Sequence, residues 1–220
     1  MTICGAPVRD RSQEFVVISN TMAVVAAFCV FCRIGYKIFV TKLDLGWDDW
    51  FILATLIAAM PSIVIAVYGT SANGLGKDMW TLPPQNITNV LFYFYTVAWL
   101  YFLQVTLVKL AILFFYMRIF PARNVQRILL GTAIFVVVWG LTFVLTTIFQ
   151  CNPIPFFWER WDLMHKGSCI NGNILSWSNA TMNIALDLWM LAIPLWQLRA
   201  LRLHWKKKVG VALMFMVGTL

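Results

Sequence analysis

Charged residues are scarce in this chain of 220 amino acids, where they make up 12% against roughly 25% in an ordinary soluble domain. Hydrophobic residues make up 61%. The scarcity is uneven, because five long stretches carry no charge at all: 15–32, 50–76, 79–108, 128–158 and 167–186. A helix of about 20 apolar residues crosses a bilayer core about 30 Å thick, so each stretch can hold a membrane helix. This pattern excludes a soluble enzyme domain, a disordered tail and a fibrous repeat.

The sequence therefore predicts an all-α fold, a polytopic bundle of transmembrane helices. We expect an extracytoplasmic tail at 1–14 and one membrane domain at 15–220. The twelve residues at 209–220 would reach only about 18 Å as a helix, which favours a chain that is part of a longer membrane protein. The prediction is five full helices and an incomplete sixth, near 15–36, 50–70, 88–117, 128–149, 174–198 and 209–220.

Catalytic and metal-binding motifs are missing. The only two histidines, His165 and His204, do not fall in a metal-ligand spacing, and neither HExxH nor GxSxG occurs. The run Gly74-Leu75-Gly76-Lys77 lacks the first glycine of a phosphate-binding loop, since Ser71 stands there. We therefore expect no enzyme activity, no cofactor and no metal. Asp48 and Asp49 are candidates for acid chemistry, but carboxylates at a helix start are more typical of capping.

Of the 17 basic residues, Lys109 lies within a predicted helix, and the other 16 are unevenly distributed between the two sides of the predicted bundle. Eleven lie in the first, third and fifth connections, and five lie in the amino-terminal tail and the other two connections. Cytoplasmic loops carry the excess of Lys and Arg, so we expect a multi-pass protein of the plasma membrane with its amino terminus outside. The net charge of +8 then reflects topology and contact with the lipid bilayer rather than nucleic-acid binding. The basic segments 118–127 and 199–208 could meet a cytosolic signalling partner.

Five cysteines fall into two groups. Cys151 and Cys169 share the fourth connection, which is predicted to face the oxidising exterior, and we expect a disulfide between them. Two free thiols, or a bond from one of them to Cys4, are the alternatives. Cys29 and Cys32 lie in the first helix, where they are interpreted as small apolar side chains, with acylation of Cys32 as the alternative.

Polar residues within the predicted membrane segments are costly and mark candidate functional positions. Ser176, Asn179, Asn183 and Asp187 recur at spacings of three and four, which places them on one face of a helix. Lys109 lies near the same depth and is expected to form an ion pair with Asp187. The stripe is consistent with two hypotheses: hydrogen bonds that hold helices together, or an outward-facing polar cavity in which Asn179 and Asn183 contact a small ligand and the ion pair acts as a switch.

Several motifs together resemble the fungal rhodopsin-domain integral membrane proteins. The resemblance covers the chain from about residue 20 and includes Asp48, Asp49 and Trp50 before the second helix. It also includes Gly74, Gly76 and Lys77, then Lys109 through Arg118, and Cys151, Cys169, Asn183, Asp187 and Pro194. Asp78 and Ala111 depart from the family pattern, which often has histidine and serine there.

This resemblance implies a seven-helix protein of the plasma membrane. Many members are proposed to be receptors coupled to G proteins, and some are encoded in secondary-metabolite gene clusters. We therefore expect a receptor-like sensor, with a membrane scaffold or an intramembrane enzyme of a metabolite pathway as the alternative. Retinal chemistry is not implied, because Lys109 does not occupy the position of a Schiff-base lysine.

Overall fold

The computed structural model describes residues 10–41, 46–78, 81–162 and 164–200. This described part of the chain is mostly helical and contains one small antiparallel sheet, which pairs Cys151 with Cys169. The long helices are α1 (Ser12–Gly35), α2 (Trp47–Val64), α3 (Pro84–Ile119), α4 (Arg123–Ile148) and α6 (Gly172–Ala200). The π-helices η1 (Tyr36–Thr41) and η2 (Ile65–Ser71) continue α1 and α2. The short elements are β1 (Cys151–Asn152), α5 (Phe156–Glu159), the 3-10 helix η4 (Arg160–Asp162) and β2 (Ser168–Cys169).

The structure confirms the predicted class, an all-α bundle of membrane helices. Within the described residues, four helical segments are long and apolar enough to cross a membrane: Ser12–Phe39, Trp47–Ser71, Pro84–Ile119 and Arg123–Ile148. The predicted fifth membrane helix is present as α6, which is long enough but does not reach the same apolarity. Its polar residues, the predicted stripe among them, lower its hydropathy. The predicted sixth helix at 209–220 lies outside the described residues.

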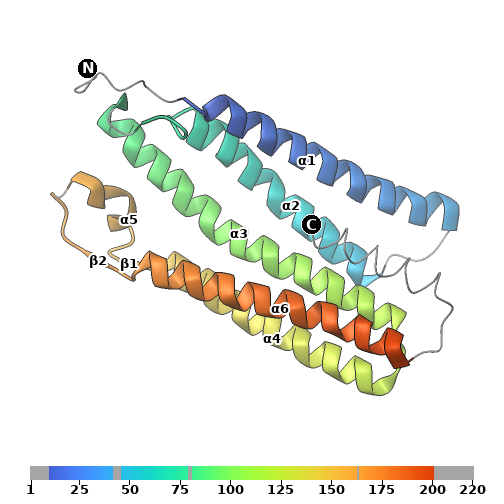
Figure 1. Ribbon diagram of the computed structural model, residues 1–220. Coiled ribbons are helices and arrows are strands. Elements are labelled where there is room, and N and C mark those ends of the chain that lie inside the picture. The colour runs from blue at the N-terminus through green and yellow to red at the C-terminus, as the bar shows by residue number, and fades with distance from the viewer. Residues whose placement is uncertain (1–9, 42–45, 79–80, 163, 201–220) are drawn as a thin grey trace. The chain divides into compact units, whose positions relative to one another are not determined.

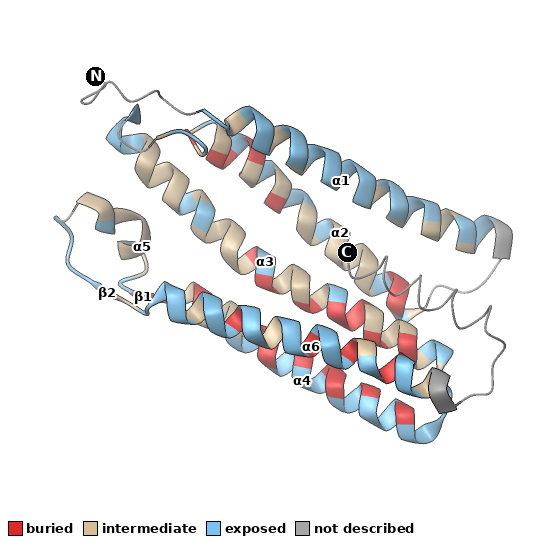
Figure 2. Ribbon diagram, viewed as in Figure 1, coloured by how far each residue is buried: buried red, intermediate tan, exposed pale blue. Residues whose placement is uncertain are grey.

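Contacts divide the chain into two units, Met1–Cys169 and Ile170–Leu220. In the first unit, α3 packs against α2 along one side and against α4 along another, and α1 lies beside α2 (Figure 1). Buried side chains concentrate on α3 and α4, whereas α1 has none (Figure 2). The first unit is therefore built around α3. The second unit contains α6.

Small residues allow close helix crossings around α3. A side chain at Gly140 of α4 would collide with Thr106 of α3, and one at Gly69 of η2 would lie 2.9 Å from the Tyr93 ring.

Near Pro61 of α2, Gln104 of α3 bridges the two helices. Its amide donates hydrogen bonds to the Ala58 carbonyl (3.1 Å) and the Ser62 hydroxyl (2.5 Å). Pro61 removes one backbone donor from α2, and the Gln104 amide binds the helix next to that break.

Candidate functional site

The most unusual feature of the first unit is a cluster of five charged side chains where α1, α2 and α3 meet, which we call the charge network. Two carboxylates at the start of α2 face three cations from the ends of α1, η1 and α3. The contacts are Arg33–Asp48 at 2.9 Å, Arg33–Asp49 at 3.6 Å, Lys37–Asp48 at 3.1 Å, Lys37–Asp49 at 2.6 Å and Arg118–Asp48 at 3.5 Å.

Local sequence positions each member of the charge network. Arg33 and Lys37 are four residues apart, so successive turns at the end of α1 present them on one side. Asp49 Oδ2 also accepts a hydrogen bond from the Gly46 backbone N–H at 3.1 Å, which caps α2. A side chain at Gly46 would lie 2.9 Å from an Arg118 guanidinium nitrogen and would collide with Asp48. The glycine therefore leaves the space that Arg118 uses to reach α2.

Both carboxylates of the charge network are withdrawn from solvent, since Asp48 is 2% exposed and Asp49 is 0% exposed. Burying an isolated carboxylate is costly, and the three cations offset that cost by direct pairing. The Arg33 guanidinium also lies over the Phe115 ring of α3, 5.1 Å from its centroid, which adds a cation–π contact. Removing either carboxylate therefore leaves an excess of cations at the network, whereas Arg118 can be removed with Arg33 and Lys37 still paired to both carboxylates. Trp50, the next residue of the predicted motif, is 59% exposed and takes no part in the network.

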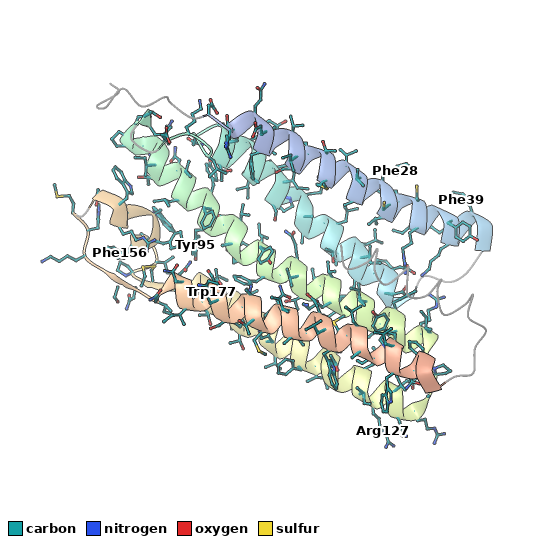
Figure 3. The ribbon with its side chains drawn as sticks, in the orientation of Figure 1. Phe28, Phe39, Tyr95, Arg127, Phe156 and Trp177 are labelled. Carbon is teal, nitrogen blue, oxygen red and sulfur yellow. A yellow bond between two sulfur atoms is a disulfide. The ribbon has the colours of Figure 1, made fainter. Side chains whose placement is uncertain are left out.

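At the opposite end of α3, the connection between α4 and α6 forms a second cluster, the disulfide loop (residues 149–171). The predicted Cys151–Cys169 disulfide is confirmed. Trp158 packs edge-on against Phe92 and Tyr95 of α3, with ring centroids 5.1 and 5.5 Å apart. Figure 3 shows Tyr95 projecting from α3 toward this loop, and its hydroxyl donates to the Ile148 carbonyl at 2.9 Å. The loop is thus fixed onto the first turns of α3.

Two polar contacts complete the disulfide loop. The Trp161 indole N–H donates to the Thr88 hydroxyl of α3 at 3.0 Å. Asp162 accepts a hydrogen bond from the Met164 backbone N–H at 3.0 Å, and this bond, together with His165, lowers the pKa of Asp162 from its ordinary value. The carboxylate is therefore held in its charged form on the loop surface.

The glycine motif binds the start of α1, in an arrangement we call the amino-terminal contact. Gly74 and Gly76 have φ angles of +105° and +92°, which favour glycine. The Arg11 backbone N–H donates to the Gly76 carbonyl at 3.1 Å, and Lys77 pairs with Asp10 at 3.4 Å. Hydrogen bonds from the Ser12 hydroxyl and N–H, with help from Lys77, lower the pKa of Asp10. The predicted turn is therefore also a docking point for the amino-terminal segment.

The predicted ligand and switch residues fall in different units. Lys109 is buried on α3 in the first unit, 4% exposed. Asn179, Asn183 and Asp187 lie on successive turns of α6 in the second unit. The helical spacing on which the polar stripe depends is therefore present, whereas the ion pair between Lys109 and Asp187 and the polar cavity remain predictions.

Sequence reasoning missed two members of the charge network. The distribution of basic residues uses Arg33 and Lys37 of the first connection only as indicators of topology, and the position of Asp48 and Asp49 at a helix start is more typical of capping than of an ion-pair network. The available signal was the spacing: two cations four residues apart precede two adjacent acids by 11 to 16 residues, with a short connection between them. Such a pattern brings opposite charges to the same end of a helical hairpin.

The fold and these two clusters define a multi-pass membrane helix bundle. A sequence comparison matches residues 32–220 to the model of the fungal rhodopsin domain, and the chain belongs to that family. This confirms the resemblance drawn from the motifs.

Three relatives are informative. The chain is 27% identical to a SAT4 family membrane protein of Emericella nidulans over 79% of this chain and 42% of the relative. It is 30% identical to satratoxin biosynthesis SC1 cluster protein 4 of Stachybotrys chartarum, over 54% of this chain and 44% of the relative. It is 24% identical to polyenoic acids biosynthesis gene cluster protein Ba17b of Metarhizium anisopliae, over 96% of this chain and 57% of the relative. The chain thus spans about half the length of these curated relatives, and no solved structure matches it.

Proposed function

We propose that this chain is the membrane domain of a receptor-like sensor in the plasma membrane, with its amino terminus outside. The disulfide supports this orientation, because disulfides persist in oxidising compartments such as the cell exterior. Four membrane helices separate the amino terminus from the disulfide loop, so both lie on the same side. The Asp10–Lys77 pair agrees, since it joins the amino-terminal segment to a connection that also lies on that side. The charge network then lies at the cytosolic end.

The observation that carries the proposal is that one helix contacts both clusters. Helix α3 has 36 residues and is about 54 Å long, well beyond the bilayer core of about 30 Å. Its first turns hold the disulfide loop through Thr88, Phe92 and Tyr95, and its last turn carries Arg118 into the charge network. A displacement imposed on α3 at the outer loop therefore changes the Arg118–Asp48 contact directly.

In this proposal, the ligand binds at the polar stripe of α6. Asn179 and Asn183 would contact a small molecule that enters from outside, and an ion pair between Lys109 and Asp187 would favour one packing of the helices over another. At the cytosolic end, the basic segment 118–127 would meet a signalling partner once Arg118 leaves the charge network. The bilayer itself is the partner of the apolar surfaces.

The test compares Arg118→Gln with Arg123→Gln in the full-length protein, expressed in the organism from which the chain comes. Arg118 is the most exposed cation of the charge network, whereas Arg123 makes no ion pair within the described residues. A sensor predicts that Arg118→Gln shifts the basal transcript profile at least two-fold at unchanged protein level, and that Arg123→Gln does not. Identical transcript profiles in the two variants and in a deletion strain would refute the sensor.

A second candidate function is a membrane component of a secondary-metabolite pathway, either scaffold or intramembrane enzyme. The names of two relatives favour it, since they are a satratoxin biosynthesis cluster protein and a polyenoic acids biosynthesis gene cluster protein. The same strains discriminate between the two functions. A pathway component predicts that deletion changes the metabolite profile while transcripts of the pathway genes stay constant, and that Arg118→Gln resembles wild type.

A further inference from the structure

Helix α1 makes its polar contacts with its neighbours at its two ends, and between them only a half-buried face of mostly small residues lines the helix (Val16, Ser19, Ala23, Ala27 and Val30). It has no buried residue, and Phe28 of α1 and Phe39 of η1, which are labelled in Figure 3, are 67% and 82% exposed. Between Ser12 and Arg33 its one side-chain hydrogen bond, from Thr21 to the Val17 carbonyl, stays within the helix. Apolar packing between helices gains little in a bilayer, because lipid tails are as apolar as the side chains. The polar contacts at the ends therefore determine where α1 is held.

The two attachments differ in strength. At the charge network, Arg33 and Lys37 pair with carboxylates that are almost completely buried. At the amino-terminal contact, one backbone hydrogen bond and one ion pair hold the helix. That pair is 3.4 Å long, and its side chains are 41% exposed for Lys77 and 49% exposed for Asp10. Exposed pairs are weak and are screened by salt, whereas breaking a buried pair leaves an uncompensated charge.

The backbone at the network end also changes its hydrogen-bond pattern. Helix α1 ends at Gly35 and continues as the π-helix η1 from Tyr36, so Arg33 lies before the change and Lys37 after it. The two cations therefore fasten both sides of this junction to the same pair of carboxylates. A helix that is fixed in this way at one end and weakly held at the other can rotate about its fixed end, so its weakly held end moves most.

We infer that α1 is a hinged helix, with the charge network as its pivot and the amino-terminal contact as its latch. When the latch opens, the first turns of α1 move away from η2 and the glycine turn that follows it, while the last turns stay in place. The movement would expose to the bilayer the side of α2 that faces α1. Neither the receptor proposal nor the pathway alternative is required for this inference, which depends on the contacts of the first unit alone.

Spin-label distances in lipid nanodiscs test the hinge directly. The background protein carries Cys4→Ser and Cys29→Ser and keeps the disulfide; Cys32→Ser is added for the first pair of labels, and Cys32 is retained for the second. One pair of labels, at Glu14→Cys and Gln85→Cys, reports the latch end of α1 against α3. A second pair, at the native Cys32 and Gln126→Cys, reports the pivot end against α4. All four positions are exposed, so the labels do not disturb the packing.

Lys77→Gln opens the latch, and Lys166→Gln, an exposed lysine on the disulfide loop, is the matched control. We expect Lys77→Gln to increase the mean latch-end distance and to at least double the width of its distribution, while the pivot-end distribution stays unchanged. Exchanging the charges with Asp10→Lys and Lys77→Asp should restore the narrow distribution. A second variant, Gly76→Ala, should act like Lys77→Gln, because the new Cβ would lie 2.9 Å from the Ser12 nitrogen.

Two results would overturn the hinge. Broadening of both distributions together would mean that α1 detaches as a whole, so the charge network is not a pivot. Unchanged latch-end distances in both Lys77→Gln and Gly76→Ala would mean that the amino-terminal contact does not hold α1. Neither result affects the transcript comparison of Arg118→Gln, so the hinge and the receptor proposal fail independently.

Discussion

At one end of the α1–α3 unit, buried carboxylates face three cations, whereas at the other end a covalent bond, aromatic rings and one exposed ion pair hold the chain together. In the proposed orientation this difference follows the chemistry of the two sides. A disulfide does not persist in the reducing cytosol, so the cytosolic end depends on charge pairing. The outer end combines a permanent crosslink with a weak, exposed contact. The comparison indicates that rigidity resides in the network and the loop, and mobility in the latch.

The largest effect is expected from Asp49→Asn, which removes one buried charge from the network and so tests whether that end is rigid. Asp49 is 0% exposed and lies 2.6 Å from Lys37, so the variant leaves cations facing a neutral amide. Breaking a buried pair by removing one partner costs about 3–5 kcal/mol. We expect this loss as a lower unfolding midpoint in detergent, followed by tryptophan fluorescence. Glu14→Gln is the control, since Glu14 is an exposed acid on α1. Equal midpoints for the two variants would contradict a charged network.

The second-largest effect is expected from Cys151→Ser, which removes the crosslink of the disulfide loop. The two cysteines are separated by 18 residues, and closing a loop of this size stabilises the folded state by about 3 kcal/mol in the chain-entropy model. We expect faster tryptic cleavage after Arg160 and Lys166, which lie in the disulfide loop. A reducing agent should reproduce this cleavage in the wild type and add nothing to the variant. The crosslink would be irrelevant to loop order if wild type and Cys151→Ser were cleaved at the same rate.

Sequence reasoning recovered the parts of this structure that depend on local chemistry. Length and apolarity specify the membrane helices, and a shared loop on the oxidising side specifies the partner of Cys151. The Arg118–Asp48 contact could not be predicted in the same way. It joins residues 70 positions apart and depends on the missing side chain of Gly46, which is a property of packing. The pairing of Asp10 with Lys77 was missed for a similar reason, since a turn prediction does not identify what docks on the turn.

The smallest effect is expected from protonation of Asp10, and it sharpens the contrast between latch and pivot. The pKa of Asp10 is lowered in the folded protein by the Ser12 hydrogen bonds and by Lys77. A carboxyl group with a lowered pKa stabilises the contact at and above neutral pH, and this contribution is lost as the pH falls below about 4.

The latch-end distance distribution measured with the labels at positions 14 and 85 should therefore broaden as the pH falls from 7 to below the lowered pKa of Asp10. Asp10→Asn should show the broad distribution at both pH values, because the variant has no carboxylate to titrate. The pivot-end distribution should stay narrow throughout, since the labels at positions 32 and 126 report the end of α1 that is held by the charge network rather than by Asp10. If Asp10→Asn retained the pH response of the wild type, another group would have to hold the latch.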